Sequence, residues 1–346
     1  MKKISFTILL TLVLVVTTLG TEPSASSRFK DVPSTYWASK QIEYLADKGI
    51  INGYSNGSFG LHDKVTRAQV AIMMARALKL NTNNPTNPGF NDVPTNFYAY
   101  KEIATLTNEG IFPNNGKFEP NRAITRGEMA LALTRAFKLK GTYMGEIYDV
   151  AQHTELYRAV DTMAANKITT IDEKGQYLPN DKLTRVQFSV FLARTIDPKF
   201  RQLAIQKDFL ANAANGKLGI CSVPFHHTKT IRDIRSKLGN PREEFGGMEF
   251  SQFYGRCAYS VSGDYEKDYI YKYSTMTSIT FLPFDPDLSL RKVEKVIGKP
   301  SDKFYDDGSA DLEGWNYMYD TGRYTVLMNA EGLYSPVQYI ELWKNQ

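Results

Sequence analysis

The sequence predicts a multidomain protein: an all-α array of three helix–loop–helix repeats, followed by an α+β domain of two helix-plus-antiparallel-sheet repeats. One set of motifs returns three times in the first half of the chain. Beyond residue 201 the composition shifts to β-prone aromatic segments, which hold 12 of the 21 tyrosines. A different helical motif occurs twice in that second half. A length of 346 residues is also ordinary for two or three domains.

The overall composition excludes several classes of protein. With 42% hydrophobic and 23% charged residues, the chain is neither disordered, nor collagen-like, nor a polytopic membrane protein. Two cysteines are too few for a disulfide framework or a cysteine zinc cluster. A formal net charge of +5 gives no reason to expect nucleic acid as a partner.

Residues 1–26 have the order of a secretory signal peptide. Lys2 and Lys3 precede an apolar run to Leu19, and small residues follow up to Ser26. We expect cleavage there, export, and no stable membrane span afterwards. An uncleaved membrane anchor is the alternative, but the run of about 16 residues is shorter than the roughly 20 that a spanning helix needs.

Two motifs define the threefold repeat, which we expect at 28–80, 88–140 and 145–198. The first is an aromatic-x-Asp-Val motif in two copies and Tyr-Asp-Val in the third. The second is a Thr-Arg pair that returns at intervals of 59 residues both times. The aspartates are Asp31, Asp92 and Asp149, and the arginines are Arg67, Arg126 and Arg185.

The threonine of each Thr-Arg pair is a predicted helix N-cap. A Gln or Glu stands three residues later in every copy, which completes a capping box. The arginine is not explained by capping, because a cation beside the positive end of a helix dipole is slightly unfavourable. Two interpretations remain open from spacing alone: an internal ion pair with Asp31, Asp92 or Asp149, or an anionic ligand.

Residues 29–69, with their two further copies, resemble the S-layer homology repeat. The resemblance implies a compact pseudo-threefold helical spindle in a Gram-positive bacterium, whose grooves bind secondary cell-wall polysaccharide, often carrying a pyruvate ketal. The arginines would then meet the acidic sugar, the aspartates would brace the grooves, and Trp37 and Tyr98 would offer a flat face to a sugar ring. The implied binding residues are Asp31, Trp37, Arg67, Asp92, Tyr98, Arg126, Glu128, Asp149 and Arg185.

Departures from the family pattern predict unequal grooves. Gln69 and Gln187 replace the usual Glu, which only Glu128 keeps, and Glu155 stands where the first repeat has Trp37. We therefore expect the third repeat to be the most degraded. Residues 28–199 carry 22 basic and 17 acidic side chains, whereas residues 201–346 carry 18 and 19. The basic excess of the first half suits an anionic polymer.

Residues 201–346 form the predicted α+β domain, with an internal duplication at 228–286 and 287–344. Each copy opens with a short amphipathic helix, after Thr230 or Ser289, that ends at a Gly-x-Pro sequence. A further helix is expected at 200–215. Strands are expected at 250–254, 258–261, 269–273, 277–282, 315–319, 324–328 and 337–343. This half resembles an uncharacterised secreted Gram-positive domain and the β-lactamase-inhibitor-protein architecture.

The second half offers little chemistry. In an exported chain we favour a disulfide between Cys221 and Cys257 over two free thiols, and over a nucleophilic Cys assisted by His226 or His227. Residues 306–311 hint at a calcium loop, but a hairpin turn explains them better. The sequence therefore predicts a non-enzymatic surface protein with no cofactor and no metal. A wall-tethered hydrolase and a protein-recognition or inhibitor module are the rival interpretations of residues 201–346.

Overall fold

The computed structural model describes residues 28–201, 204–245, 249–262, 274–285, 287–308 and 313–345. The predicted signal peptide and the strand expected at 269–273 lie outside these residues. The described chain forms two hydrophobic cores, one from residues between 29 and 193 and one from residues between 205 and 342. Among the helices described, none combines the length and the hydrophobicity needed to cross a bilayer.

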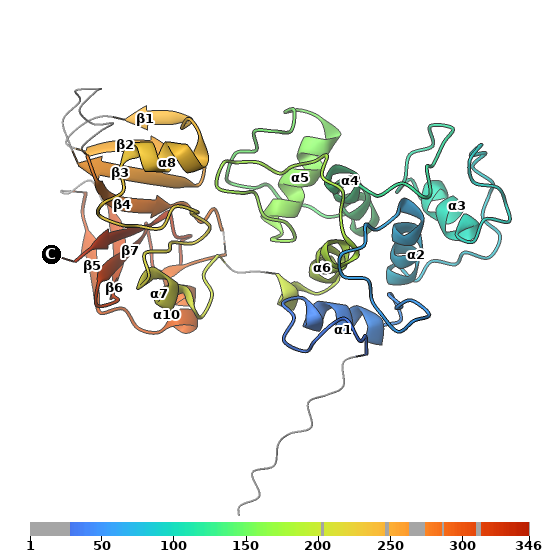
Figure 1. Ribbon diagram of the computed structural model, residues 1–346, viewed down its shortest axis with the longest axis horizontal. Helices are drawn as coiled ribbons and strands as arrows, with labels where there is room; N and C mark the ends of the chain where they lie inside the picture. The colour runs from blue at the N-terminus through green and yellow to red at the C-terminus, as the bar shows by residue number, and fades with distance from the viewer. Residues whose placement is uncertain are drawn as a thin grey trace, which may run out of the picture.

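The first half contains two helices for each repeat, as predicted (Figure 1). The second helix of each pair begins at the arginine of the Thr-Arg motif. The threonine before it (Thr66, Thr125 or Thr184) forms the predicted capping box with Gln69, Glu128 or Gln187. The helices are α1 (Ser39–Asp47), α2 (Arg67–Ala77), α3 (Tyr100–Asn108), α4 (Arg126–Phe137), α5 (Glu155–Ala165) and α6 (Arg185–Ile196).

A closed ring of three backbone hydrogen bonds joins the repeats just before their second helices. The Val65 N–H donates to Leu183 O at 3.0 Å, the Leu183 N–H to Ile124 O at 3.0 Å, and the Ile124 N–H to Val65 O at 3.1 Å. All three side chains are buried, so each repeat contributes one apolar residue to the centre of the array. The array is therefore cyclic: the N-terminus of every second helix contacts the next repeat, and the third repeat contacts the first.

The second half is one antiparallel sheet of eight described strands, in the order β1-β2-β3-β4-β8-β7-β6-β5. The β4–β8 pair joins two four-stranded halves, and α8 (Ile231–Leu238) precedes the first half as α10 (Leu290–Ile297) precedes the second. The internal duplication at 228–286 and 287–344 stays a prediction. The strands are β1 (Glu243–Phe245), β2 (Glu249–Phe253), β3 (Cys257–Ser262), β4 (Met276–Phe281), β5 (Asp302–Asp306), β6 (Gly314–Asp320), β7 (Tyr324–Ala330) and β8 (Tyr339–Lys344).

The helix expected at 200–215 is wrong over most of its length. Only a 3-10 turn (Pro198–Phe200) and the short α7 (Phe209–Ala213) are present among the residues described there. This segment contains three residues of low helix propensity, namely Asp208, Asn212 and Asn215. The Asn212 side chain donates to the Asp208 carboxylate and the Asn215 side chain to Ala211 O. The edge strands β1 and β5 were not predicted, because their exposed, charged residues give no alternation of apolar and polar side chains.

Candidate functional site

Each of the three arginines reaches across to the next repeat and holds the backbone of its loop. In every case the guanidinium Nε donates to the carbonyl of an aromatic residue, and the guanidinium carbon lies 4.6–5.0 Å from the centre of that ring. The pairs are Arg67 with Phe118 O at 2.7 Å, Arg126 with Tyr177 O at 2.8 Å, and Arg185 with Phe59 O at 2.9 Å.

The three aspartates hold the same aromatic residues from the opposite side. Each carboxylate accepts hydrogen bonds from the N–H of the aromatic residue and from the N–H that follows it, at 2.6–2.8 Å. The pKa of Asp31 and of Asp92 is lowered, because these backbone bonds outweigh the effect of burial, which alone would raise it. Among the described residues, no ion pair joins one of these arginines to one of these aspartates, so the suggested pairing is wrong. The two side chains instead bind the backbone of the same loop residue.

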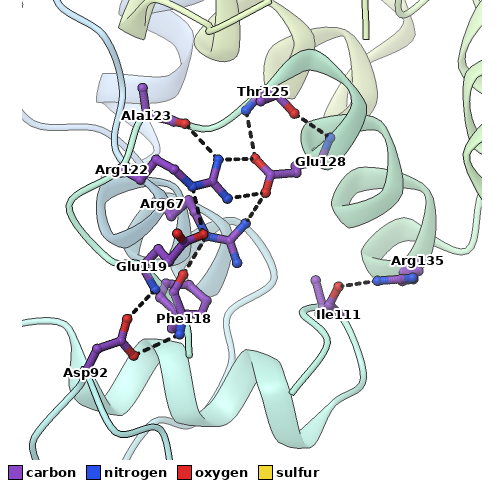
Figure 2. A network of polar contacts seen from close by, with 10 residues as sticks. All are labelled: Arg67, Asp92, Ile111, Phe118, Glu119, Arg122, Ala123, Thr125, Glu128 and Arg135. Atoms are coloured by element: carbon purple, nitrogen blue, oxygen red, sulfur yellow. Dashed lines mark hydrogen bonds and ion pairs between the residues drawn. The ribbon is translucent and has the colours of Figure 1, made fainter. Parts of the chain in front are cut away.

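We call each arginine, together with the loop that it holds, a corner. In the Arg67 corner the guanidinium is paired with a carboxylate of the protein (Figure 2). Arg67 is 6% exposed, and its Nη1 lies 2.9 Å from the Oε1 of Glu128. The same carboxylate pairs with Arg122, which also contacts Glu119 at 2.9 Å. Burial alone would raise the pKa of Glu128, but hydrogen bonds from Arg122 and from the Thr125 N–H, together with Arg67, hold it below its usual value. Both guanidinium groups of this corner, those of Arg67 and Arg122, are therefore paired with carboxylates of the protein itself.

The Arg126 corner is open. A hollow of about 540 Å³ lies here, and Arg126 itself is only partly buried. In the Arg126 corner, the neutral Gln187 occupies the position that Glu128 occupies in the Arg67 corner. Each is the third residue after the capping threonine. Besides the bond from its Nε to Tyr177 O, Arg126 donates from its Nη2 to Thr169 Oγ1 at 3.3 Å. The lining residues are Lys64, Arg126, Thr170, Asp172, Gln176, Tyr177, Leu178, Asp181, Lys182, Leu183, Thr184 and Gln187.

The Arg185 corner is intermediate. Gln69 stands at the position of Glu128, but Arg185 is 6% exposed and its Nη2 donates to Asn52 O at 3.0 Å. Burial lowers the pKa of Arg185, and the nearby Tyr54 and Asp63 offset only part of that effect. A guanidinium this deep is less available to a ligand than Arg126.

Trp37 and Tyr98 are strongly exposed, at 59% and 63%. Each packs against the aromatic residue before it, with ring centres 5.8 Å and 4.5 Å apart. Neither lines the hollow at Arg126. The structure therefore does not bring all nine predicted residues together, and their contact with polysaccharide stays a prediction.

Sequence reasoning missed most of the lining of the Arg126 hollow, including Lys64, Lys182 and Tyr177. Lys64 and Lys182 each stand two residues before a capping threonine, and Lys64 donates to Lys182 O at 3.0 Å. The 59-residue offset that aligns the Thr-Arg pairs also aligns Tyr177 with Phe59 and Phe118. That alignment could have found Tyr177, whereas the approach of the two lysines depends on the closed ring of repeats.

The C-terminal domain contains the predicted disulfide between Cys221 and Cys257. Both thiols are consumed by it, so the interpretation of a nucleophilic cysteine is wrong. His226 hydrogen-bonds the Thr228 hydroxyl at 2.8 Å and stacks on His227. Within the described residues, no three His, Cys, Asp or Glu side chains lie close enough to hold a metal ion. Exposed aromatic residues lie on the edge strands, namely Phe245, Phe304 and Tyr305.

Comparison with known proteins identifies the three repeats. The family model of the S-layer homology domain matches residues 28–71, 89–130 and 146–189, so the chain carries three S-layer homology domains. "S-layer protein EA1" of Bacillus anthracis is 31% identical over 183 residues, which is 51% of this chain and 21% of that protein. An "S-layer protein" of Bacillus licheniformis is also 31% identical over 183 residues, covering 51% of this chain and 20% of its own length.

The match to these relatives covers about half of this chain and about one fifth of their own length. Among solved structures, a DUF4309 family protein from Bacillus subtilis aligns with 40% of this chain and 95% of its own length. Its sequence identity is 18% and its TM-score 0.31.

Proposed function

We propose that this chain is an exported cell-surface protein whose three S-layer homology domains, at 28–80, 88–140 and 145–198, bind secondary cell-wall polysaccharide without a covalent bond. The C-terminal domain, residues 201–346, is then displayed at the wall as a binding module. The domains that match the family and the S-layer proteins of two bacilli support this location.

The observation that carries the proposal is the open corner at Arg126. A partly buried guanidinium is oriented by a carbonyl and an aromatic ring, faces a neutral Gln187, and lies beside Lys64 and Lys182. A planar guanidinium binds a carboxylate through two parallel hydrogen bonds. A sugar that carries a carboxylate, such as a pyruvate ketal, meets both requirements of the hollow: an anion for Arg126 and hydroxyls for its amide and threonine side chains.

The proposed binding is salt-sensitive. Lys64 and Lys182 have two carboxylates beside them in the hollow, Asp172 and Asp181, so the local excess of positive charge is small. Coulombic attraction between exposed groups is screened over about 8 Å at physiological ionic strength. Hydrogen bonds at the half-buried Arg126 should resist screening better than the lysines do.

Sedimentation with purified cell-wall sacculi tests the proposal. The exported chain should pellet with sacculi that retain their acidic polysaccharide and stay in the supernatant with sacculi from which it has been removed. Arg126→Ala should weaken binding about tenfold, or 1.4 kcal/mol, whereas Arg185→Ala should weaken it less than threefold. Failure of the chain to pellet with intact sacculi refutes wall anchoring, and equal losses in the two variants refute unequal grooves.

A further inference from the structure

The C-terminal domain packs against the same loop that forms one side of the Arg126 hollow. We call residues 169–177 the wall segment. On one side of it, Arg126 contacts Thr169 Oγ1 and Tyr177 O. On the other side it contacts residues of the second domain, far away in sequence. Hollow and domain contact are therefore two faces of one short piece of chain.

Backbone groups of the turn before β3 dock on the wall segment. The Arg256 N–H donates to Glu173 O at 3.1 Å, and its Nη1 reaches Ile171 O at 3.5 Å. A Cβ atom on Gly255 would lie 2.9 Å from Glu173 O and 3.0 Å from the Gly175 nitrogen, and the φ of Gly255 is +91°. Only glycine permits this approach without strain.

The Glu173 side chain enters the second domain. It is 9% exposed, and its Oε2 accepts from the Ser222 N–H at 2.8 Å and from the Tyr259 hydroxyl at 3.1 Å. Ser222 follows Cys221, whose disulfide to Cys257 ties it to β3. A carboxylate buried with two donors contributes stability only while both domains hold that geometry.

Two further contacts flank the wall segment. Lys167 Nζ lies 2.6 Å from the buried carboxylate of Asp285 and 2.9 Å from the exposed carboxylate of Asp287. Phe284 packs against the core of the repeats, where its ring centre lies 6.0 Å from that of Tyr143. The interface thus combines an apolar contact, one buried ion pair to Asp285, one exposed ion pair to Asp287, and backbone hydrogen bonds.

The other two repeats lack this cover in the described structure. Their corresponding turns, 54–57 and 113–117, are exposed at every residue. Residues 171–177, by contrast, are buried or half-buried throughout. The repeat that supports the open hollow is therefore the one that the C-terminal domain holds.

We propose that the C-terminal domain positions the wall segment, residues 169–177. Binding of the acidic cell-wall polysaccharide in the Arg126 hollow and docking of the C-terminal domain then strengthen each other. This inference rests on the proposed function. Lys167, Glu173 and Arg256 are positioning residues, since they touch the wall segment or its flank and not the hollow. Linkage requires that the factor by which docking strengthens binding equals the factor by which ligand strengthens docking.

Charge reversal at Lys167 tests the inference in the full exported chain. Lys167→Glu places a third carboxylate against Asp285 and Asp287 and opposes docking. Lys138→Glu is the matched control, because Lys138 is exposed, has a φ of 50° against 58° for Lys167, and loses the same charge. In binding isotherms with polymer-retaining sacculi, Lys167→Glu should raise the dissociation constant at least fivefold over Lys138→Glu.

A milder pair of variants covers the case in which Lys167→Glu fails to fold. Tyr259→Phe removes the hydroxyl that donates to Glu173, and Tyr319→Phe removes one that donates to Gly298 O, away from the interface. Tyr259→Phe should weaken sacculus binding two- to threefold, and Tyr319→Phe should not.

The reciprocal effect is read by hydrogen exchange at the Ser222 amide. Soluble polysaccharide released from the sacculi should slow exchange at Ser222, in the C-terminal domain, as well as at Leu178 beside the hollow. If the wild-type chain binds sacculi but both interface variants match their controls and Ser222 is unchanged, the coupling is refuted and wall anchoring stands. If the wild-type chain does not bind sacculi, the proposed function itself fails.

Discussion

The Arg67 corner and the Arg126 corner begin from the same geometry and end with different chemistry. In both, a guanidinium Nε holds the carbonyl of an aromatic residue in the next repeat, and an aspartate holds that residue's N–H. The difference is one position in the capping box: Glu128 in the first, Gln187 in the second. Either side chain caps its helix, but only the glutamate neutralises the arginine.

The contrast separates two roles that one motif can combine. At the Arg67 corner the guanidinium pairs with Glu128, which also pairs with Arg122. Arg122 in turn pairs with Glu119 (Figure 2). At the Arg126 corner the same side chain keeps its structural bond to Tyr177 and leaves part of its guanidinium facing a hollow. A repeat can therefore keep its fold while its groove gains or loses capacity for an anion.

The largest effect that would test this contrast is on stability. Arg67→Ala removes one of the two arginines paired with the half-buried Glu128, which keeps Arg122 and the Thr125 N–H, and it removes the donor to Phe118 O. We expect a loss of about 3 kcal/mol in the free energy of unfolding, since removal of one partner from a buried pair is costly. Arg126→Ala should cost about 1 kcal/mol, the value of ordinary hydrogen bonds.

Urea denaturation followed by far-UV circular dichroism measures both variants. The ratio of their losses is the quantity of interest, because both changes remove the same number of atoms. Similar losses for the two alanine variants would contradict the assignment of a structural role to Arg67 and a binding role to Arg126.

The sequence predicted the capping boxes of these corners, but not which arginine pairs with a carboxylate. The capping boxes follow from residues three positions apart, so Thr125 and Glu128 could be assigned their helix-capping roles at once. The partner of Arg67 lies 61 residues away and is brought near by the ring of Val65, Ile124 and Leu183. Nothing in spacing along the chain distinguishes a buried Arg67 from a half-buried Arg126.

In the C-terminal domain, too, local elements were predicted from the sequence and a contact between distant residues was not. Its helices after Thr230 and Ser289 carry strong apolar stripes and were predicted closely. The contact between Glu173 and Tyr259 joins residues 86 positions apart in two different domains, and no pattern in either sequence announces it. Packing between domains depends on shape, which local periodicity does not encode.

The second test exchanges the one side chain that distinguishes the corners. Gln187→Glu gives the Arg126 corner the carboxylate of the Arg67 corner and preserves the capping box. The new carboxylate should pair with Arg126 and weaken binding to sacculi about fivefold, or 1 kcal/mol. Gln69→Glu is the control with the same change of charge, and it should weaken binding less because Arg185 is already buried.

Binding isotherms at two salt concentrations separate pairing from general repulsion. A loss caused by added negative charge alone should appear equally in Gln187→Glu and Gln69→Glu and shrink in high salt. An undiminished affinity in Gln187→Glu would show that Arg126 does not meet the polymer.

The smallest expected effect is on the response to acid, and it belongs to the closed corner. The folded-state pKa of Glu128 lies below its ordinary value of 4.5, because the bonds from Arg122 and Thr125 and the charge of Arg67 outweigh burial. A group with a depressed pKa contributes stability at pH values above its unfolded pKa, and that stability is lost as the pH falls through its folded pKa.

Between about pH 5 and pH 3, the wild-type free energy of unfolding should therefore fall more steeply than that of Glu128→Gln. The two curves should converge at low pH, where the wild-type carboxylate is protonated as well. Parallel curves across this range would mean that the Arg67 network does not hold Glu128 ionised, and the distinction between a closed and an open corner would lose its electrostatic basis.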